Sequence, residues 1–290
     1  MKMRWLAMAV LTLGSGLVHA EVKTEYLELK PDDASKKAYL AQPYRIWGTK
    51  NYKASPERFN ALLVLSNSKV KFVFHLLGKL ENGIAKNVQI GMLRPSVFNW
   101  YAGGFFTVQS GKNKLDAGVF SVKEIKSGAE SGYAELEYSH SAFNGKIRLE
   151  LMDNDDKLLL SFTPAGQIPY SINLYAYPGT YGNAKLRDRQ VTTNMGVVDG
   201  KIKKLTSQDC WAVFSDKYYD KVQNRGDGCC AVLFNPKELL PGSVIRCGYA
   251  CTSYLYYRKG QRANLIFWDF KGWSAKQAVD YMKKLDVQFE

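Results

Sequence analysis

The sequence predicts a mainly β protein, an antiparallel β-sandwich that ends in one α-helix. Short runs of alternating apolar and polar residues recur about every dozen residues, and Gly, Pro, Asn and Asp separate them. The helical periods that a parallel sheet requires between its strands do not occur before the end of the chain. This rhythm is typical of a sandwich or a barrel rather than of strand–helix–strand units.

The clearest stretch is residues 133–164, which predicts three antiparallel strands. Asn144-Gly145 predicts a two-residue type I′ turn, because both positions tolerate positive φ. Residues 153–156, Asp-Asn-Asp-Asp, predict the next reversal, after which Leu158, Leu160 and Phe162 continue an apolar face. Counted from the first turn, the predicted apolar pairs are Tyr138 with Leu151, His140 with Leu149, and Ala142 with Ile147.

The remaining elements follow the same alternation. Residues 21–60 are polar and predict a strand and loop that wrap the sheets. Beyond them, strands are predicted at 61–65, 70–76, 103–109, 118–125, 133–140, 171–177, 190–194, 211–215, 230–234, 244–246, 252–257 and 263–270. Residues 274–286 predict the helix, because Ser274 and Gln277 form a capping-box pattern and an apolar stripe follows.

Residues 1–20 predict a secretory signal peptide. Lys2 and Arg4 precede an apolar run that is too short to span a bilayer, and Val18-His19-Ala20 fits a cleavage site. Residues 21–290 then form one predicted domain, which includes the helix. No later run predicts a transmembrane segment, so the protein is expected to be exported, either periplasmic or extracellular.

The chain is basic. Removing Lys2 and Arg4 from its 40 Lys and Arg residues leaves 38, against 27 acidic residues. Such a balance attracts acidic polysaccharide, lipopolysaccharide or free nucleic acid, although scattered lysines also serve simply to solvate strand surfaces. No basic cluster interleaved with aromatic residues occurs, so no specific nucleic-acid partner is predicted. No cofactor is predicted either.

Five cysteines lie between residues 210 and 251. In an exported protein they predict disulfides, and the odd number leaves at least one thiol free or paired between chains. The favoured bridge joins either residue of the 229–230 pair to Cys247 or Cys251; buried free thiols are the alternative. A zinc site is disfavoured, because no His follows His140, and no metal is predicted. The disulfide candidates are Cys210, Cys229, Cys230, Cys247 and Cys251.

Two histidines remain after cleavage. His140 should lie on the apolar hairpin face, as a hydrogen-bonded residue at the core edge or as an acid–base group in a cleft. His75 is expected at the surface or at a sheet end. His140 is therefore the best catalytic candidate and His75 the second. Asp153, Asp155 and Asp156 are most simply turn formers.

Aromatic residues cluster in two predicted loops, 98–104 and 175–181. Tyrosine and tryptophan in loops offer flat apolar faces with polar tips that can stack on sugar rings, or they can cap the ends of the sandwich. The neighbouring arginines could clamp a carboxylate or a sulfate. The candidate binding residues are Trp100, Tyr101, Tyr177, Tyr181, Arg187 and Arg189.

Three runs resemble the galactose-mutarotase-like β-supersandwich proteins of carbohydrate metabolism: EYSHSAFNGKIRLELMDNDDKLLLSFTP, SINLYAYPGTYGN and NLIFWDFKGW. The resemblance implies two stacked antiparallel sheets, supersandwich-like, with a concave face that receives a sugar. In that family's epimerases two histidines and a late glutamate transfer protons. Here His75 and His140 come in the matching order, but the late glutamates, Glu238 and Glu290, lie on no predicted strand.

Taken together, the sequence favours an exported carbohydrate-binding or accessory protein whose partner is a glycan, polyanionic glycans included. Two alternatives stay open. One is a carbohydrate-active enzyme, an epimerase or a polysaccharide lyase that uses His140. The other is an envelope structural or assembly protein that has no small-molecule site.

Overall fold

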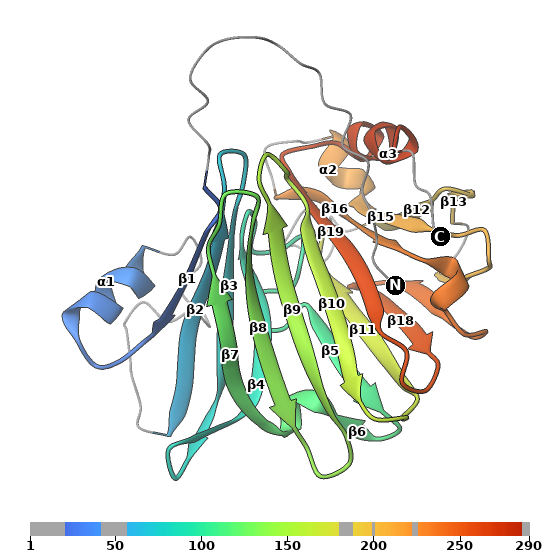
Figure 1. The fold of residues 1–290 in the computed structure, drawn as a ribbon. Coiled ribbons are helices and arrows are strands. Elements are labelled where there is room, and N and C mark those ends of the chain that lie inside the picture. Colours follow the sequence, from blue (N-terminus) through green and yellow to red (C-terminus); the bar gives the residue numbers. More distant parts are fainter. Residues whose placement is uncertain (1–20, 42–56, 180–187, 199–200, 222–225, 286–290) are drawn as a thin grey trace.

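A computed structural model of the chain describes residues 21–41, 57–179, 188–198, 201–221 and 226–285. The predicted signal peptide and the candidate residues Tyr181 and Arg187 lie outside these ranges. The described residues form two antiparallel sheets packed face to face, with a helix at the C-terminal end (Figure 1). The predicted fold class, a mainly β sandwich with a C-terminal helix, is confirmed.

The described part of the large sheet has thirteen strands. In spatial order they are β1 (Lys23–Glu28), β2 (Arg58–Ser66), β3 (Lys71–Glu81), β4 (Ile84–Arg94), β7 (Val119–Lys126), β8 (Ser131–Ser139), β9 (Asn144–Met152), β10 (Leu158–Ala165), β19 (Ala263–Lys271), β16 (Gly228–Phe234), β15 (Trp211–Asp216), β12 (Arg189–Thr193) and β13 (Gly196–Val197).

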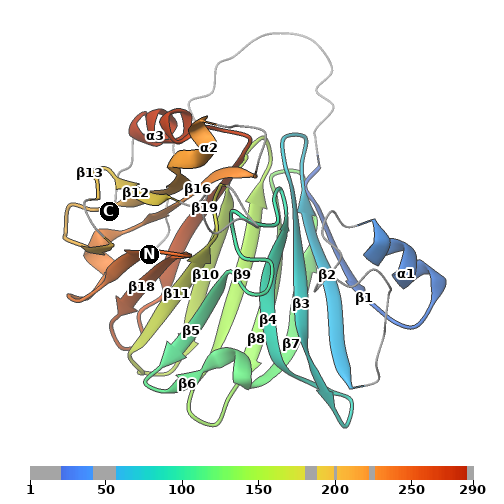
Figure 2. The same cartoon turned by 180° about the vertical axis from the view of Figure 1, so that it is seen from behind.

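The small sheet lies behind it in Figure 1 and in front of it in Figure 2. Its described strands, in spatial order, are β14 (Ile202–Lys204), β17 (Val244–Cys247), β18 (Cys251–Tyr257), β11 (Tyr170–Ala176), β5 (Phe106–Ser110) and β6 (Asn113–Lys114). The helices are α1 (Asp33–Leu40), α2 (Lys217–Lys221), α3 (Ala275–Lys283) and the 3₁₀ turns η2 (Leu115–Ala117) and η4 (Pro236–Glu238).

The main core fills the space between the sheets, and the sequence alternation decides which side chains enter it. Leu136, Leu149 and Leu160 face inward from neighbouring strands of the large sheet. Ile172 and Leu255 face them from the small sheet. The predicted inward residues Leu158, Leu160 and Phe162 are buried, and the predicted reversal at 153–156 joins β9 to β10.

The predicted type I′ turn at Asn144-Gly145 is wrong. Strand β9 begins at Asn144, and Tyr138 pairs with Gly145 rather than with Leu151. A glycine is required at position 145 for close packing and not for a positive φ, because a Cβ there would lie 2.3 Å from the ring of Phe162. Asn144 caps the longer turn by accepting a hydrogen bond from the His140 amide at 2.7 Å. The register moves by an even number of residues, so the predicted inward face survives.

Two helices cover the outer face of the large sheet at separate places. Ser274 caps α3 with the predicted capping box, and Ala278 and Met282 pack on a cluster from β15, β16 and β19. Helix α1 was not predicted. Its Tyr39 packs on Leu62 and Val73 of β2 and β3. Strand β4 was also missed, because its first half carries Lys, Asn and Gln among few apolar residues.

Residues 98–105 connect the two sheets. The amide of Phe105 donates to Ile90 in β4 at 3.0 Å, and the amide of Tyr101 donates to Tyr175 in β11 at 3.1 Å. The Tyr177 amide donates back to the Phe98 carbonyl at 3.0 Å. This segment therefore places its aromatic residues where the sheets meet. No helix in the described ranges is long and apolar enough to cross a membrane.

Candidate functional site

The structure brings three of the predicted binding residues together with one that was not predicted. The ring centroids of Tyr101 and Tyr177 lie 5.1 Å apart, and those of Tyr177 and Tyr249 lie 5.7 Å apart. The guanidinium carbon of Arg189 lies 5.5 Å from the Tyr177 ring and 5.8 Å from the Tyr249 ring. We call Tyr101, Tyr177, Tyr249 and Arg189 the tyrosine cluster.

The four residues of the cluster come from four separate segments. Tyr101 lies in the connection between the sheets, and Tyr177 follows the last residue of β11. Arg189 begins β12, and Tyr249 lies in the turn between β17 and β18. Tyr249 is 58% exposed and Tyr101 is 36% exposed, so both rings are open to a ligand. An aromatic residue on a tight turn between two predicted strands is the signal that could have revealed Tyr249.

Arg189 supplies the buried charge of the cluster. It is 9% exposed, and its Nε donates to the carbonyl of Pro178 at 3.2 Å. A guanidinium near aromatic faces is stabilised by the ring quadrupoles. Arg189 therefore holds Tyr177 and Tyr249 in place.

The cluster continues onto the outer face of the small sheet. Outward residues of β11 and β18 lie side by side in the register, with Tyr175 opposite Thr252 and Asn173 opposite Tyr254. Arg246 of β17 adds an exposed guanidinium 5.3 Å from the Tyr254 ring. No described helix packs on this face, whereas α3 and α1 pack on the large sheet (Figure 2).

Asn173 is a buried polar residue on the same side of β11. It is 4% exposed, and its amide nitrogen donates to Gln109 at 3.1 Å. Its amide oxygen has no hydrogen-bond partner among the described residues. Tyrosines, amides and arginines together can stack on sugar rings, bind hydroxyl groups and pair with anions.

Trp100 does not belong to this surface, which corrects its predicted role in binding. Its side chain is fully buried, and Nε1 donates to the carbonyl of Trp268 at 2.9 Å. Its ring makes edge contacts with Phe214 and Phe267, so neither face is open to a sugar. Trp100 instead anchors the segment that presents Tyr101.

A second anchor of this segment is a polar network around Asp269. The Ser96 hydroxyl and the Asn99 amide nitrogen each donate to its carboxylate at 2.7 Å. Burial raises the pKa of Asp269 to about 7, although these hydrogen bonds act in the opposite direction. The network ties the segment before Trp100 to β19.

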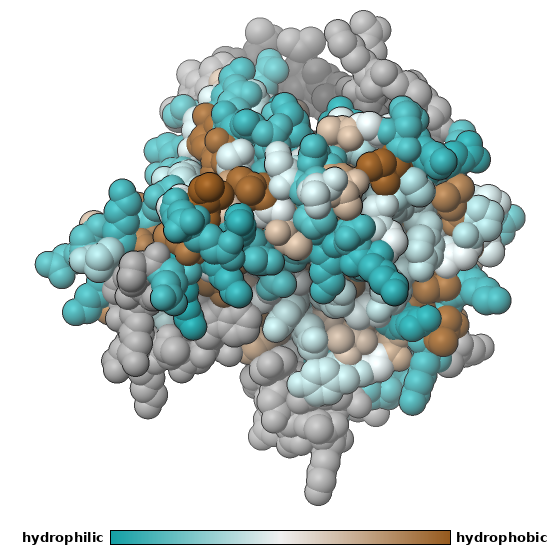
Figure 3. All heavy atoms as spheres, turned by 90° about the horizontal axis from the view of Figure 1, so that it is seen from below, coloured by the Kyte–Doolittle hydropathy of each residue, from teal (hydrophilic) through white to brown (hydrophobic). Residues whose placement is uncertain are grey.

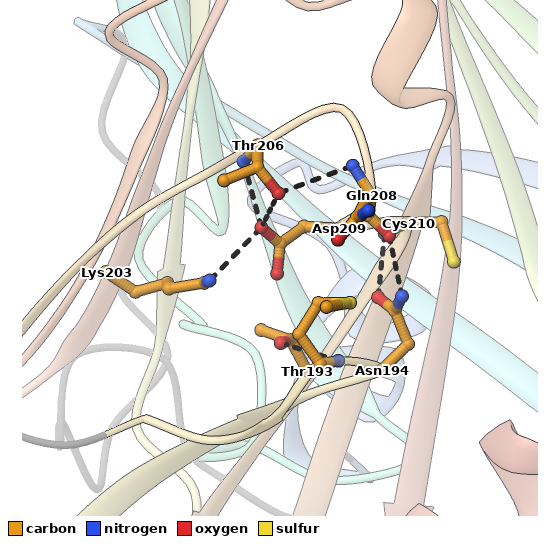
Figure 4. Close-up of polar contacts among 8 residues, drawn as sticks. Thr193, Asn194, Lys203, Thr206, Gln208, Asp209 and Cys210 are labelled. Atoms are coloured by element: carbon orange, nitrogen blue, oxygen red, sulfur yellow. Dashed lines mark hydrogen bonds and ion pairs between the residues drawn. The ribbon is translucent and has the colours of Figure 1, made fainter.

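A third network fixes the edge strands around β12 (Figure 4). Thr206 donates to the Asp209 carboxylate from its amide and from its hydroxyl, each at 2.8 Å, and Lys203 of β14 lies 3.2 Å away. Asn194, after β12, accepts from the Cys210 amide at 2.9 Å. Burial opposes ionisation, but the hydrogen bonds and Lys203 lower the pKa of Asp209. The network links β14 of the small sheet to the end of β12 in the large sheet.

The predicted bridge from Cys229 or Cys230 to the 247–251 hairpin is not formed, and none of the five cysteines is disulfide-bonded in the structure. Cys229 packs under α3, where its thiol donates to the Trp273 carbonyl at 3.4 Å. Cys230 faces the other way, and its thiol donates to the Asn99 carbonyl at 3.2 Å. Cys229 and Cys230 are consecutive residues of β16, so their side chains point to opposite faces of the sheet.

The two histidines lie apart from the tyrosine cluster. His75 is 2% exposed in the middle of β3, so its predicted surface position is wrong, and burial lowers its pKa to about 4. His140 lies in the β8–β9 turn, where its Nδ1 accepts from the Ala142 amide at 3.0 Å. Its predicted pairing with Leu149 on the apolar face is therefore also wrong. Neither histidine has a carboxylate partner in the described ranges.

A half-open groove of about 750 Å³ lies elsewhere, between β1, the β3–β4 hairpin and β7. Phe59 and Phe120 form its apolar floor, and Glu28 and Arg58 line its edge. Neither histidine lines this groove. In the described ranges, no three His, Cys, Asp or Glu residues gather to hold a metal ion.

No protein-family model and no curated protein matches the chain. Among solved structures, a mutant of heparan sulfate lyase HepC from Pedobacter heparinus is 10% identical with a TM-score of 0.40, over 83% of this chain and 42% of that one. Paenibacillus xanthan lyase is 6% identical with a TM-score of 0.44, over 82% and 27%. Slr1438 from Synechocystis sp. PCC 6803 is 11% identical with a TM-score of 0.42, over 76% and 99%.

The chain thus spans less than half the length of either lyase. Likeness at this level assigns neither a family nor an activity.

Proposed function

We propose that the protein is an exported carbohydrate-binding protein that holds an acidic glycan on the tyrosine cluster and the adjoining outer face of the small sheet. Four separate segments bring Tyr177 and Tyr249 together with Arg189 and place Tyr101 against Tyr177, and this arrangement carries the proposal. We also propose that the two sheets form a scaffold of the galactose-mutarotase-like supersandwich type.

The chemistry of the face supports a sugar ligand. Tyr101 and Tyr249 offer ring faces at the rim, and rings of this kind stack on the apolar faces of sugars. Strand β11 rises about 3.3 Å per residue, so the outward residues from Asn173 to Tyr177 cover roughly 13 Å, enough for more than one sugar unit. A linear oligosaccharide lying along β11 fits this arrangement.

The charge of the face supports an acidic ligand rather than a neutral one. Arg246 is exposed, and Lys201 and Lys204 are exposed on the neighbouring segment. The net charge of the chain is also positive. Positive side chains close to a stacking surface would attract and orient a carboxylate or a sulfate group.

The enzyme hypothesis, an epimerase or lyase that uses His140, has less support. Ala165 at the end of β10 pairs with Asn144, so the turn that holds His140 lies at the end of the sandwich where β11 begins. Tyr177 follows the other end of β11. His140 and the tyrosine cluster are therefore at opposite ends of the sandwich.

The assembly hypothesis requires a continuous apolar patch. In the view from below, the brown apolar residues form small separate groups among teal polar ones on the described part of that face (Figure 3). Such scattered apolar residues are normal for a protein surface. The described part of this face therefore offers no continuous apolar patch for assembly.

The test is a binding assay with heparan sulfate, polygalacturonate and a neutral cellulose oligosaccharide as probes. We expect Tyr177→Ala and Tyr249→Ala to weaken binding of an acidic probe about ten- to hundredfold, which is the usual effect of removing a central aromatic contact. Arg246→Gln should lower affinity for the acidic probes and leave the neutral one unchanged.

Tyr133→Ala is the matched control. Tyr133 lies on the outer face of the large sheet, with the Arg148 guanidinium carbon 3.4 Å from its ring centroid. It therefore reproduces a tyrosine–arginine contact away from the cluster, and its removal should leave binding unchanged. Equal losses of affinity for Tyr133→Ala and Tyr249→Ala would rule out a specific site on the cluster. The same holds if the protein binds every probe and moderate salt abolishes all of this binding, because such binding depends on charge alone.

A further inference from the structure

The turn that carries Tyr249 is closed by two cysteines. Cys247 ends β17, Cys251 begins β18, and the two residues are direct partners in the antiparallel register. Direct partners of this kind have Cα atoms about 4.5–5.5 Å apart, which is within the range of disulfides. The two Sγ atoms lie 2.7 Å apart, much closer than the usual contact between non-bonded atoms.

The other three cysteines are placed differently. Cys229 and Cys230 direct their thiols to the backbone carbonyls of Trp273 and Asn99. Cys210 lies before β15, where its amide is bound by Asn194. The 247–251 pair is therefore the one whose sulfur atoms are already in contact.

We infer that Cys247 and Cys251 form a disulfide in the exported protein, and that this bond fixes Tyr249 at the rim of the tyrosine cluster. The first part stands on the hairpin geometry and on the proposed export. The second part rests on the proposed function, because it assigns the fixed ring to glycan binding. An exported protein meets the oxidising conditions in which such a bond persists.

The chemistry of the pair fits stepwise oxidation. The hydrogen bond with Cys251 lowers the pKa of Cys247, against the effect of burial, and the charge of Arg189 acts in the same direction as the hydrogen bond. Burial raises the pKa of Cys251. Cys247 is thus the better nucleophile of the two.

The oxidant required is a disulfide, either of a thiol–disulfide oxidoreductase or of a small molecule. The Cys247 thiolate attacks one of its sulfur atoms, forms a mixed disulfide and releases the other sulfur as a thiolate. Cys251 loses its proton and attacks the Cys247 sulfur, which expels the second oxidant sulfur. Two thiols become one disulfide, and the oxidant is reduced to two thiols.

The bond would close a five-residue turn, Cys-Gly-Tyr-Ala-Cys. The Gly248 amide already donates to the Ala250 carbonyl at 3.0 Å, so the turn is compact. Tyr249, at its centre, is the most exposed ring of the cluster. A covalent closure reduces the conformations open to this ring before a ligand arrives, and such preorganisation strengthens binding.

Peptide mapping tests the bond directly. The full chain is isolated from an oxidising compartment without reductant, its free thiols are alkylated, and it is digested with trypsin. Cleavage after Arg246 and Arg258 leaves Cys247 and Cys251 on one peptide, while Cys210 and the 229–230 pair fall on two others. We expect the 247–258 peptide to be unalkylated and two hydrogens lighter than its reduced form, and the others to be alkylated.

Alkylation of both Cys247 and Cys251, or a cross-link between the 247–258 peptide and the peptide of Cys229 and Cys230, would overturn the inference. Cys210→Ser is the matched control, because it removes a cysteine and should leave the map of residues 247–258 unchanged. Cys251→Ser should expose Cys247 to alkylation.

Binding to the heparan sulfate probe then tests the effect on Tyr249. We expect Cys251→Ser, or treatment of the wild type with reductant, to weaken binding about two- to tenfold, and Cys210→Ser to have no effect. An unaltered affinity would overturn the role assigned to the bond. An intact bond in a protein whose affinity survives Tyr249→Ala would overturn the proposed function but leave the disulfide standing.

Discussion

The guanidinium carbon of Arg189 lies 5.5 Å from the centroid of the Tyr177 ring. This contact joins the start of β12, in the large sheet, to the end of β11, in the small sheet. It forms where the two sheets come together, and Tyr249 extends it toward solvent. The contact is thus both part of the structure that closes the sandwich and part of the surface proposed to bind glycan.

Arg189→Ala should lower the free energy of unfolding by about 2–4 kcal/mol, because the substitution removes a desolvated cation–π contact and a charged hydrogen bond to Pro178. Arg246→Ala is the matched control. Arg246 makes a similar contact with Tyr254 at the surface, and its loss should cost about 0.5–1 kcal/mol. Urea denaturation of both variants measures the difference, and equal costs would contradict the buried role of Arg189.

Trp100→Ala should lower the free energy of unfolding by about 3–5 kcal/mol, because it empties a fully buried site between the sheets. Tyr101→Ala, at the neighbouring partly exposed position, should cost about 1 kcal/mol or less. Glycan affinity should show the reverse order. Tyr101→Ala should weaken glycan binding, whereas Trp100→Phe, which keeps most of the packing, should leave it almost unchanged. A loss of affinity in Trp100→Phe at unchanged stability would restore a direct binding role for Trp100.

Asp209→Ala should cost about 3 kcal/mol of unfolding free energy, because it leaves the amide and hydroxyl of Thr206 and the ammonium of Lys203 without their acceptor. Asp188→Ala is the control. Asp188 is exposed and lies 3.6 Å from Lys217, so its removal should cost about 0.5 kcal/mol. Similar unfolding midpoints in urea for the two variants would show that the network does not secure the sheet edges.

Two buried groups should give the stability opposite pH dependences. Burial raises the pKa of Asp269 to about 7. Between about pH 4 and pH 7 the folded state therefore binds more protons at Asp269 than the unfolded state does, so the contribution of Asp269 to the free energy of unfolding falls as pH rises. Burial lowers the pKa of His75 to about 4, so the unfolded state binds more protons below its own pKa near 6.5. The His75 contribution therefore rises with pH between about 4 and 6.5.

Single variants separate these slopes. Relative to wild type, the unfolding free energy of Asp269→Asn should rise more steeply between pH 4 and 7, and that of His75→Gln should fall more steeply. Unfolding curves in urea at several pH values measure both. If the unfolding free energy of both variants changed with pH as it does in the wild type between pH 4 and 7, the pKa values of Asp269 and His75 would not be shifted by burial.

The sequence alone determined most of the strands, their inward faces and the terminal helix. Alternation along 70–76 and 158–162 predicts which side chains enter the core, because a strand turns successive residues to opposite faces wherever it is placed. The capping box of Ser274 is likewise local, since its partners are three residues apart. These features depend on neighbours within a few positions, and the structure confirms them.

The tertiary structure decided what depends on distant partners. Gly145 became a packing site because the Phe162 ring, from the next strand, occupies the space a side chain would need. Trp100 and Tyr101 looked alike in the sequence, but the contacts of Trp100 with Phe214 and Phe267 bury one and leave the other exposed. Tyr249 contacts Arg189 because the packing of the two sheets places the β17–β18 turn beside β12. Contacts between residues far apart in the chain depend on how the sheets pack, and no local pattern encodes that packing.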